Sequence, residues 1–257
     1  MLAAGCGGSP PGPPAPPAPA APVPARPVFP VPPPRLGRTR PFQEEPPFRK
    51  AEREAMVERQ LRSIGVTDED VLRAMAALPR HLFVPEDLVE SAYDDTPLPI
   101  GHGQTISAPD VVGYMTQALG VRKGARVLDV GTGSGYQAGV LAEMGCRVFS
   151  IEILDPLART AAARLADLGY EAVTVRTGDG YAGWPEEAPF DGILVAAAPE
   201  EVPEALVGQL KPGARLVLPV GKQGEAQRLL VLTKRADGGV DREETLAVRF
   251  VPMVKGR

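Results

Sequence analysis

The chain has 257 residues, and 17 of its 30 prolines lie within residues 1–47. Its formal net charge of −4 gives no general electrostatic attraction to nucleic acid, so nucleic acid is not an expected partner. Two cysteines and two histidines are too few for a disulfide framework or a multi-histidine metal site, and no apolar run approaches the ~20 residues that span a bilayer.

Residues 1–47 are predicted to be a disordered, polyproline-like segment, because proline lacks a backbone donor and fixes φ. The sequence that ends at Cys6 resembles a bacterial lipoprotein signal, in which the cysteine is lipid-modified and the Pro-rich stretch would serve as a tether. Only five residues precede Cys6, so the charged and apolar parts of such a signal would have to lie upstream. The alternative is that the resemblance of these residues to a lipoprotein signal is due to chance. Residues 48–257 suffice for one α/β domain.

Downstream of the Pro-rich segment, apolar residues recur at helical spacing. Val57, Leu61 and Ile64 predict the apolar face of a first helix, which ends at Gly65. A capping-box pattern over residues 67–70 predicts the start of a second helix.

A turn-rich stretch over residues 94–109 is expected to be one long ordered loop, and a helix is predicted at 110–119. Beyond it strands alternate with helices, and Asp155 is expected to cap one of these helices. The strands are predicted at 126–130, 147–151, 171–176, 190–196, 215–220, about 228–233 and about 245–251. This order predicts an α/β fold with a doubly wound, mostly parallel, Rossmann-like sheet, an antiparallel edge hairpin and N-terminal helices.

The sharpest motif is a glycine loop at the end of the first core strand, with Gly131, Gly133 and Gly135 at alternate positions. Glycine lets a backbone approach a ligand closely, and ligands of open α/β sheets bind at the carboxyl ends of strands. A dinucleotide fingerprint would need glycine at Tyr136, and no Gly-Lys-Ser/Thr follows as in a phosphate loop. The spacing, with Asp129 two residues ahead, resembles the S-adenosylmethionine loop of class I methyltransferases.

Two more acids follow the next two strands. Glu152 is placed to accept hydrogen bonds from both hydroxyls of a ribose, although a solvated acid at a strand end has the same pattern. Asp179 is placed to accept from an adenine amino group while Gly180 allows close approach, and the alternative is a plain turn residue. The three acids in this order favour S-adenosyl-L-methionine as the methyl donor.

The chain also resembles one particular family, the protein-L-isoaspartate O-methyltransferases, over about residues 50–257. The segments that carry the resemblance are 99–107, 131–137, 178–180, 188–191, 210–213, 218–221 and 249–256. The resemblance implies a class I, metal-free repair enzyme that works as a cytoplasmic monomer. Its partners would be damaged proteins, in which it transfers a methyl group from S-adenosylmethionine to the α-carboxylate of L-isoaspartyl residues.

By the same resemblance Ser107 is the active-site serine, Thr105 and Ile106 help it to cover the cofactor, and Thr132 contacts the cofactor from the glycine loop. The residues that would border the peptide are Ala197, Pro199, Pro219 and Val220. A carboxylate acceptor is already ionised near pH 7 and a sulfonium donor is already activated, so alignment and exclusion of water are the main requirements. Ser107 is therefore expected to orient the acceptor rather than to act as a nucleophile.

Some alternatives stay open. His102, near Ser107 in the sequence, could act as a base or could face solvent. Residues 196–199 lack the amide or acid with which methyltransferases of nucleic-acid amino groups hold their acceptor. The alternative functions are another class I small-molecule or protein carboxyl methyltransferase, and a non-catalytic S-adenosylmethionine-binding protein.

Overall fold

The structure is a computed structural model that describes residues 28–29 and 49–256. Most of the predicted disordered segment, including Cys6, lies outside the described residues. Within it, Val28–Phe29 forms a short strand, β1, which pairs antiparallel with the strand β6 (Val173–Thr177) at one edge of the sheet. We had expected no sheet ladder in this segment. A strand of two residues fits between Pro27 and Pro30, which have no N–H to extend it.

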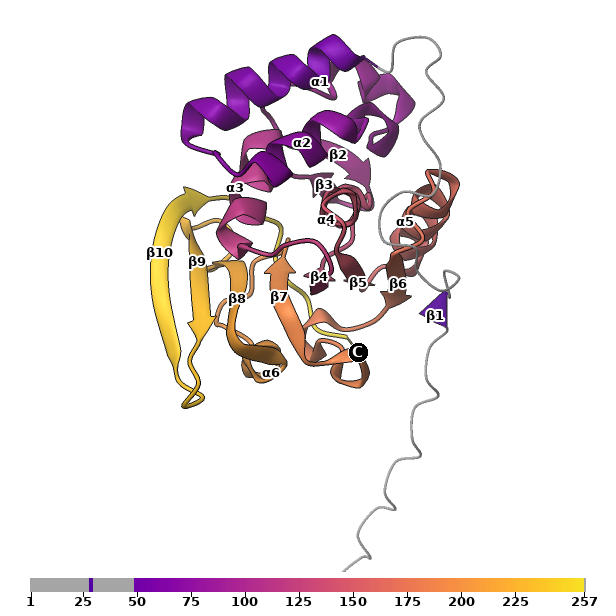
Figure 1. Cartoon of the computed structure of the whole chain (residues 1–257). Helices are drawn as coiled ribbons and strands as arrows, with labels where there is room; N and C mark the ends of the chain where they lie inside the picture. The colour runs from indigo at the N-terminus through magenta and orange to yellow at the C-terminus, as the bar shows by residue number, and fades with distance from the viewer. Residues whose placement is uncertain (1–27, 30–48, 257) are drawn as a thin grey trace, which may run out of the picture.

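The centre of the molecule is one sheet of eight strands in the order β1-β6-β5-β4-β7-β8-β9-β10 (Figure 1). Its other strands are β4 (Arg126–Val130), β5 (Arg147–Glu152), β7 (Phe190–Val195), β8 (Leu210–Val220), β9 (Gln227–Lys234) and β10 (Val240–Val248). The strands from β4 to β8 are parallel, whereas β9 and β10 add an antiparallel meander. The predicted fold class is confirmed.

Helices cover both faces of this sheet. The main helices are α1 (Lys50–Met56), α2 (Glu69–Ala77), α3 (Pro109–Leu119), α4 (Tyr136–Glu143), α5 (Asp155–Asp167) and α6 (Glu204–Gly208). The short helical turns are η1 (Val57–Leu61), η2 (Arg62–Ile64), η3 (Arg80–Phe83), η4 (Glu86–Ser91), η5 (Gly180–Ala182) and η6 (Pro185–Glu187). Successive strand residues point to opposite faces, so in β4 Val127 packs in the cluster with α1 to α5, whereas Leu128 packs in the cluster with α6.

Two local predictions were wrong, and a third was right in position but not in detail. Ile64 is 43% exposed at the end of the helical segment, as the last residue of the 3₁₀ turn η2 before the C-cap Gly65, whereas Val57 and Leu61 are buried. The second helix begins within residues 67–70 as predicted, but its cap is Asp68, which accepts from the N–H of Asp70 at 3.0 Å, and not a reciprocal capping box. Asp155 does not cap α5 but is its first residue.

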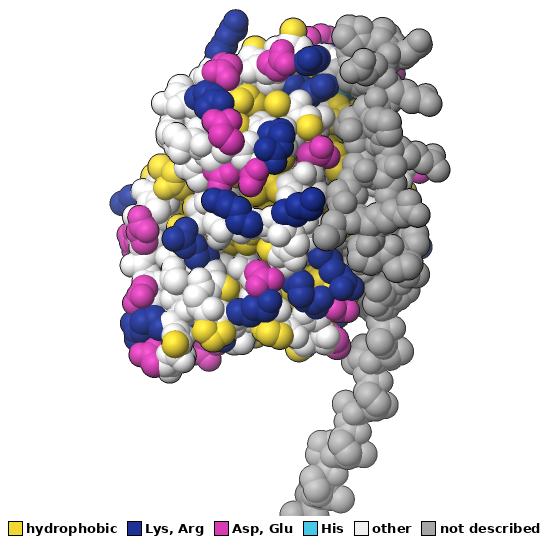
Figure 2. Space-filling view, in the orientation of Figure 1, with side chains coloured by type: hydrophobic (Ala, Val, Ile, Leu, Met, Phe, Trp, Pro, Cys, Tyr) yellow, Lys and Arg dark blue, Asp and Glu magenta, His cyan; other side chains and the backbone are white. Residues whose placement is uncertain are grey.

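The visible surface carries both signs of charge. In Figure 2, lysine and arginine side chains are mixed with aspartate and glutamate side chains over the N-terminal helices and the sheet. Among the described residues, no helix is long and apolar enough to cross a membrane.

Candidate functional site

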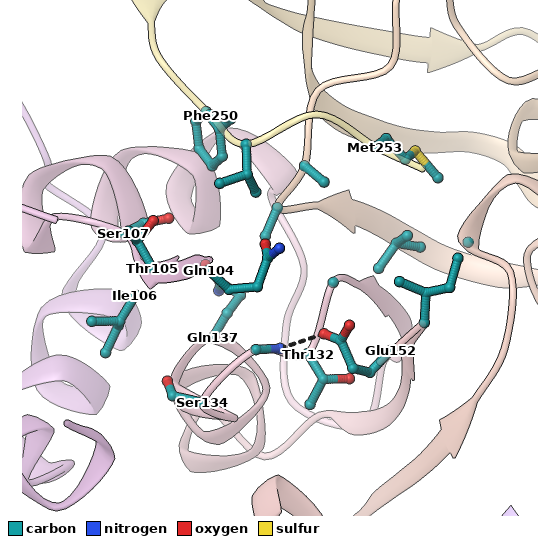
Figure 3. Close-up of a pocket in the computed structure, with 18 of the residues that line it drawn as sticks. Gln104, Thr105, Ile106, Ser107, Thr132, Ser134, Gln137, Glu152, Phe250 and Met253 are labelled. Atoms are coloured by element: carbon teal, nitrogen blue, oxygen red, sulfur yellow. Dashed lines mark hydrogen bonds between the residues drawn. The ribbon is translucent and has the colours of Figure 1, made fainter. Parts of the chain in front are cut away.

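A pocket lies at the carboxyl ends of the parallel strands, where ligands of open α/β sheets bind (Figure 3). Three segments far apart in the sequence enclose it. They are the glycine loop after β4, the segment that ends at Ser107, and the C-terminal residues beyond β10. The predicted site residues that line it are Thr105, Ile106, Ser107, Gly131, Thr132, Gly133, Glu152, Gly180 and Ala197.

The glycine loop turns sharply from β4 into α4. Gly131, Gly133 and Gly135 all have positive φ, at 93°, 53° and 91°, which a residue with a Cβ adopts only with strain. The N–H of Gly131 donates to the carbonyl of Ile151 at 2.8 Å, so the loop is fixed to the end of β5. Gly135 lies outside the pocket lining and packs against Leu165 of α5 instead.

Glu152 connects the end of β5 to the glycine loop. Its side chain is 6% exposed, and its carboxylate accepts from the N–H of Gly133 at 2.9 Å and from the N–H of Leu154 at 3.0 Å. The first of these bonds is the dashed line in Figure 3. Each carboxylate oxygen keeps further acceptor capacity toward the pocket. The alternative of a freely solvated acid at the strand end is therefore wrong.

Asp129 lies behind the loop, outside the pocket lining. It is completely buried, at 0% exposed, and accepts from the hydroxyl of Ser150 at 2.7 Å. The same hydroxyl is 2.6 Å from the hydroxyl of Thr132, which lines the pocket. Burial is the main reason why the pKa of Asp129 rises to about 7. The geometry makes Asp129 a support for Thr132 and the glycine loop.

Asp179 lies at the edge of the site as the N-cap of the turn η5. Its side chain accepts from the N–H of Tyr181 and, with its other oxygen, from the N–H of Gly256, both at 2.9 Å. Asp179 is thus a turn residue that also holds the end of the chain. Only its neighbour Gly180 lines the pocket.

The C-terminal residues 250–256, here named the C-terminal strap, form a wall of the pocket that the sequence analysis did not assign to the site. Ala198 holds the strap by donating its N–H to Val251 and accepting from the N–H of Met253, both at 2.8 Å. Phe250 and Met253 both lie along the pocket in Figure 3. The last strand was expected at about 245–251, but β10 spans Val240–Val248, so Phe250 and Val251 belong to the strap. The signal was the proline at 252, which has no N–H to continue a sheet ladder.

Ser107 follows a β-hairpin instead of lying in an irregular loop. The hairpin pairs β2 (Leu98–Gly101) with β3 (Gln104–Ile106). It forms because Gly101 and Gly103, with φ of 88° and 71°, permit a tight turn around His102. His102 is exposed at that turn and does not line the pocket. Ser107 does line it, and its carbonyl accepts from Arg80 at 2.8 Å.

Only one of the four residues expected to border the peptide lines the pocket. Ala197 lines the pocket, whereas Pro199, Pro219 and Val220 lie outside its lining. The Pro199 carbonyl accepts from the N–H of Gly221 at 3.0 Å, which joins the end of β8 to the loop that holds the C-terminal strap. These residues therefore lie next to the strap rather than in the pocket.

Gly180 lines the pocket at a point with no room for a side chain. A Cβ at this position would lie 2.4 Å from Val130 Cγ1 and 2.9 Å from Met253 Cε. We expect Gly180→Ala to lower the free energy of unfolding by about 1–3 kcal/mol through overpacking and to displace the C-terminal strap. Urea unfolding measures this. The control is Gly208→Ala, because a Cβ there meets no atom within 4 Å, and equal losses in both variants would contradict the expectation.

No group of three or more His, Cys, Asp or Glu side chains in the described part of the chain could hold a metal ion. His81, the other histidine, is half-buried with its Nδ1 2.7 Å from the Tyr93 hydroxyl, and burial lowers its pKa. It lies outside the pocket lining, so the polar chemistry of the pocket comes from hydroxyls, amides, backbone groups and Glu152.

The comparisons with known proteins agree with one another. The model of the family "Protein-L-isoaspartate(D-aspartate) O-methyltransferase (PCMT)" matches residues 51–257. A protein from Opitutus terrae named protein-L-isoaspartate O-methyltransferase is 58% identical over 207 residues, which cover 80% of this chain and 88% of that protein. One of the same name from Gloeobacter violaceus is 54% identical over 200 residues, which cover 78% of this chain and 97% of that protein.

Solved structures show the same relationship. A protein-L-isoaspartate O-methyltransferase superposes with a TM-score of 0.72 at 29% identity, over 79% of this chain and 65% of that one. A Plasmodium falciparum protein described as a putative protein-L-isoaspartate O-methyltransferase in complex with S-adenosyl-L-homocysteine superposes with a TM-score of 0.69 at 27% identity, over 79% of this chain and 99% of that one. With a family model that matches well over half of its length, this chain belongs to the protein-L-isoaspartate(D-aspartate) O-methyltransferase family.

Proposed function

We propose that this chain transfers a methyl group from S-adenosylmethionine to the α-carboxylate of L-isoaspartyl residues in damaged proteins and peptides. The observation that carries the proposal is a single pocket with Ser107 on one side and Glu152 on the other (Figure 3). The Ser107 hydroxyl is suited to bind an acceptor carboxylate, and the Glu152 carboxylate is suited to bind a ribose. Family membership supports the same reaction.

The residues of the pocket fit S-adenosylmethionine. Glu152 offers a buried carboxylate beside backbone groups of the glycine loop, which is the donor and acceptor set that a ribose requires. Gly180 lines the pocket with its backbone, because a Cβ there would clash with Val130 and Met253. We assign this close backbone surface, with the neighbouring Asp179, to the adenine end. When bound, the cofactor supplies an activated methyl group on a sulfonium.

The protein's own contribution is alignment and the exclusion of water. The hairpin that ends at Ile106 and the C-terminal strap stand on two sides of the pocket, so that together they restrict access of water to it. The Ser107 hydroxyl donates a hydrogen bond to one oxygen of the acceptor carboxylate and leaves the other oxygen directed at the methyl group. The acceptor is ionised near pH 7, so no base has to remove a proton from it.

The peptide lies between Ser107 and the strap in this proposal. Ala197 contacts it inside the pocket, and Pro199, Pro219 and Val220 border it outside, next to residues that hold the strap. His102 faces solvent at the hairpin turn and takes no part in proton transfer.

We expect Ser107→Ala to lower kcat by roughly 10-fold or more, because a hydrogen bond to a charged acceptor is lost. The dissociation constant of S-adenosylhomocysteine should change by less than about threefold, since Glu152 is untouched. Methyl-transfer kinetics and calorimetry measure the two quantities. Ser63→Ala, at an exposed position in the turn η2, is the matched control. Equal losses of turnover and of cofactor affinity would show that Ser107 supports the cofactor instead.

The whole proposal is tested by transfer of labelled methyl groups to an isoaspartyl peptide and to its normal aspartyl counterpart. We expect transfer to the first and none to the second. Transfer to neither, with intact binding of S-adenosylhomocysteine, would favour the non-catalytic binding protein instead.

Location and assembly belong to the same proposal. We assign the enzyme to the cytoplasm as a monomer, and a lipid anchor at Cys6, which lies outside the described residues, is the alternative. Mass analysis of the native N-terminus and light scattering distinguish these states.

A further inference from the structure

Arg80 is a buried cation directly behind the pocket. It belongs to the turn η3, and its side chain is 0% exposed. Its Nε donates to the carbonyl of Ala92 at 2.7 Å and its Nη2 donates to the carbonyl of Ser107 at 2.8 Å. Its guanidinium carbon lies 4.9 Å from the centre of the Tyr136 ring. Because Ser107 and Tyr136 both line the pocket, the charge lies one hydrogen bond behind its wall.

This cation has no carboxylate partner at ion-pair distance among the described residues, and Asp95 acts on it only from further away. Burial lowers the pKa of the guanidinium, but arginine keeps its charge in proteins. A buried charge without a counter-ion is unfavourable for folding, and an apolar residue of similar volume is often better tolerated. Packing therefore does not explain why an arginine occupies this position.

The chemistry of the acceptor does explain it. Under the proposed function, on which this inference rests, the group that must bind beside Ser107 is an anionic carboxylate. We propose that Arg80 is a positioning residue that fixes the backbone of Ser107 through its carbonyl and makes this side of the pocket selective for an anionic acceptor. Glu152 lies on the other side of the pocket, so the effect falls on the peptide more than on the cofactor (Figure 3).

Two substitutions separate the two contributions. Arg80→Met removes the charge and both hydrogen bonds, and we expect the KM for an isoaspartyl peptide to rise about 10-fold or more. Arg80→Lys keeps the charge, but one ammonium does not reproduce the planar fork that reaches Ala92 and Ser107, so an intermediate rise is expected. The dissociation constant of S-adenosylhomocysteine should stay within about twofold in both variants.

The matched control is Arg53→Met. Arg53 is also buried, at 9% exposed, and donates to the carbonyl of Ala76 at 2.7 Å, but it is not among the residues that line the pocket and makes no hydrogen bond to Ser107. Arg53→Met should lower the free energy of unfolding without a selective rise in the KM for the isoaspartyl peptide. A merely structural role for Arg80 would instead raise the KM and the dissociation constant of S-adenosylhomocysteine together.

The outcomes remain decisive if Arg80→Met fails to fold. Arg80→Lys then carries the test, and a KM equal to that of the wild type would overturn the positioning role. Where both variants fold, an equal KM in all three proteins overturns the whole inference. Failure of the proposed function looks different, because the wild-type protein itself would then not methylate the isoaspartyl peptide.

Discussion

Glu152→Gln is expected to weaken the binding of S-adenosylhomocysteine by roughly 10- to 100-fold, the cost of a lost charge-assisted hydrogen bond in a buried site. The carboxylate now accepts from the backbone N–H groups of Gly133 and Leu154, at 2.9 and 3.0 Å. A glutamine would place its own amide N–H groups against one of these donors. The substitution therefore removes a ribose acceptor and loosens the glycine loop at the same time.

Calorimetry with S-adenosylhomocysteine measures this effect. Glu201→Gln is the matched control, because Glu201 is exposed and lies outside the pocket lining, and it should leave the affinity unchanged. The kcat at saturating cofactor should fall less than the affinity, since Glu152 lies opposite Ser107 in the pocket. An unchanged affinity in Glu152→Gln would refute the assignment of this residue to the ribose.

The core of the fold could be predicted because its signals are local and repeated. The strand β4 was predicted with its observed bounds, Arg126–Val130, and Glu152 at the end of β5 was recognised by its place after a buried strand. Buried parallel strands form continuous apolar runs, and glycines at alternate positions mark the turn that follows. The helix boundaries at Gly65 and Asp68 were predicted correctly, but the exposure of Ile64 and the hydrogen bond that caps α2 depend on the detailed geometry of the helix ends, which the apolar spacing does not specify.

The candidate site was predicted only in part, because two of its walls come from tertiary contacts. The C-terminal strap reaches the pocket through Ala198, more than 50 residues away in sequence, and nothing in either segment specifies that pairing. Arg80 is not singled out by the sequence, because charged residues are mostly exposed and the burial of a single arginine cannot be seen in the sequence. Asp129 was recognised by its position, but the sequence does not show that its side chain points away from the pocket.

Asp129→Asn is expected to remove a large pH dependence from the stability of the protein. The carboxyl is fully buried, and burial, with a further contribution from Glu152, raises its pKa to about 7, whereas the hydrogen bond from Ser150 acts in the opposite direction. In the unfolded chain an aspartate has a pKa of about 3.9. Between these two values the folded protein retains a proton that the unfolded chain releases.

The sign of the effect follows from that difference in bound protons. The free energy of unfolding of the wild type should fall as the pH rises toward 7, and Asp129 should cost no further stability above about pH 8. From pH 5 to pH 8 the loss that Asp129 contributes is about 2 to 3 kcal/mol, at 1.36 kcal/mol for each pKa unit. An asparagine does not titrate, so this contribution is absent from Asp129→Asn.

Urea unfolding of both proteins at several pH values between 5 and 8 tests this, because all other titrating groups cancel in the difference between them. Asp167→Asn, at an exposed position, should give a curve parallel to the wild type. The asparagine oxygen can still accept from Ser150, so the bond from Ser150 to Thr132 persists, and affinity for S-adenosylhomocysteine should change by less than about threefold. If the free energies of unfolding of the wild type and of Asp129→Asn change in parallel with pH, the buried Asp129 carboxylate is charged. Asp129 would then act on the glycine loop through its charge and not, as the geometry indicates, through the hydroxyls of Ser150 and Thr132.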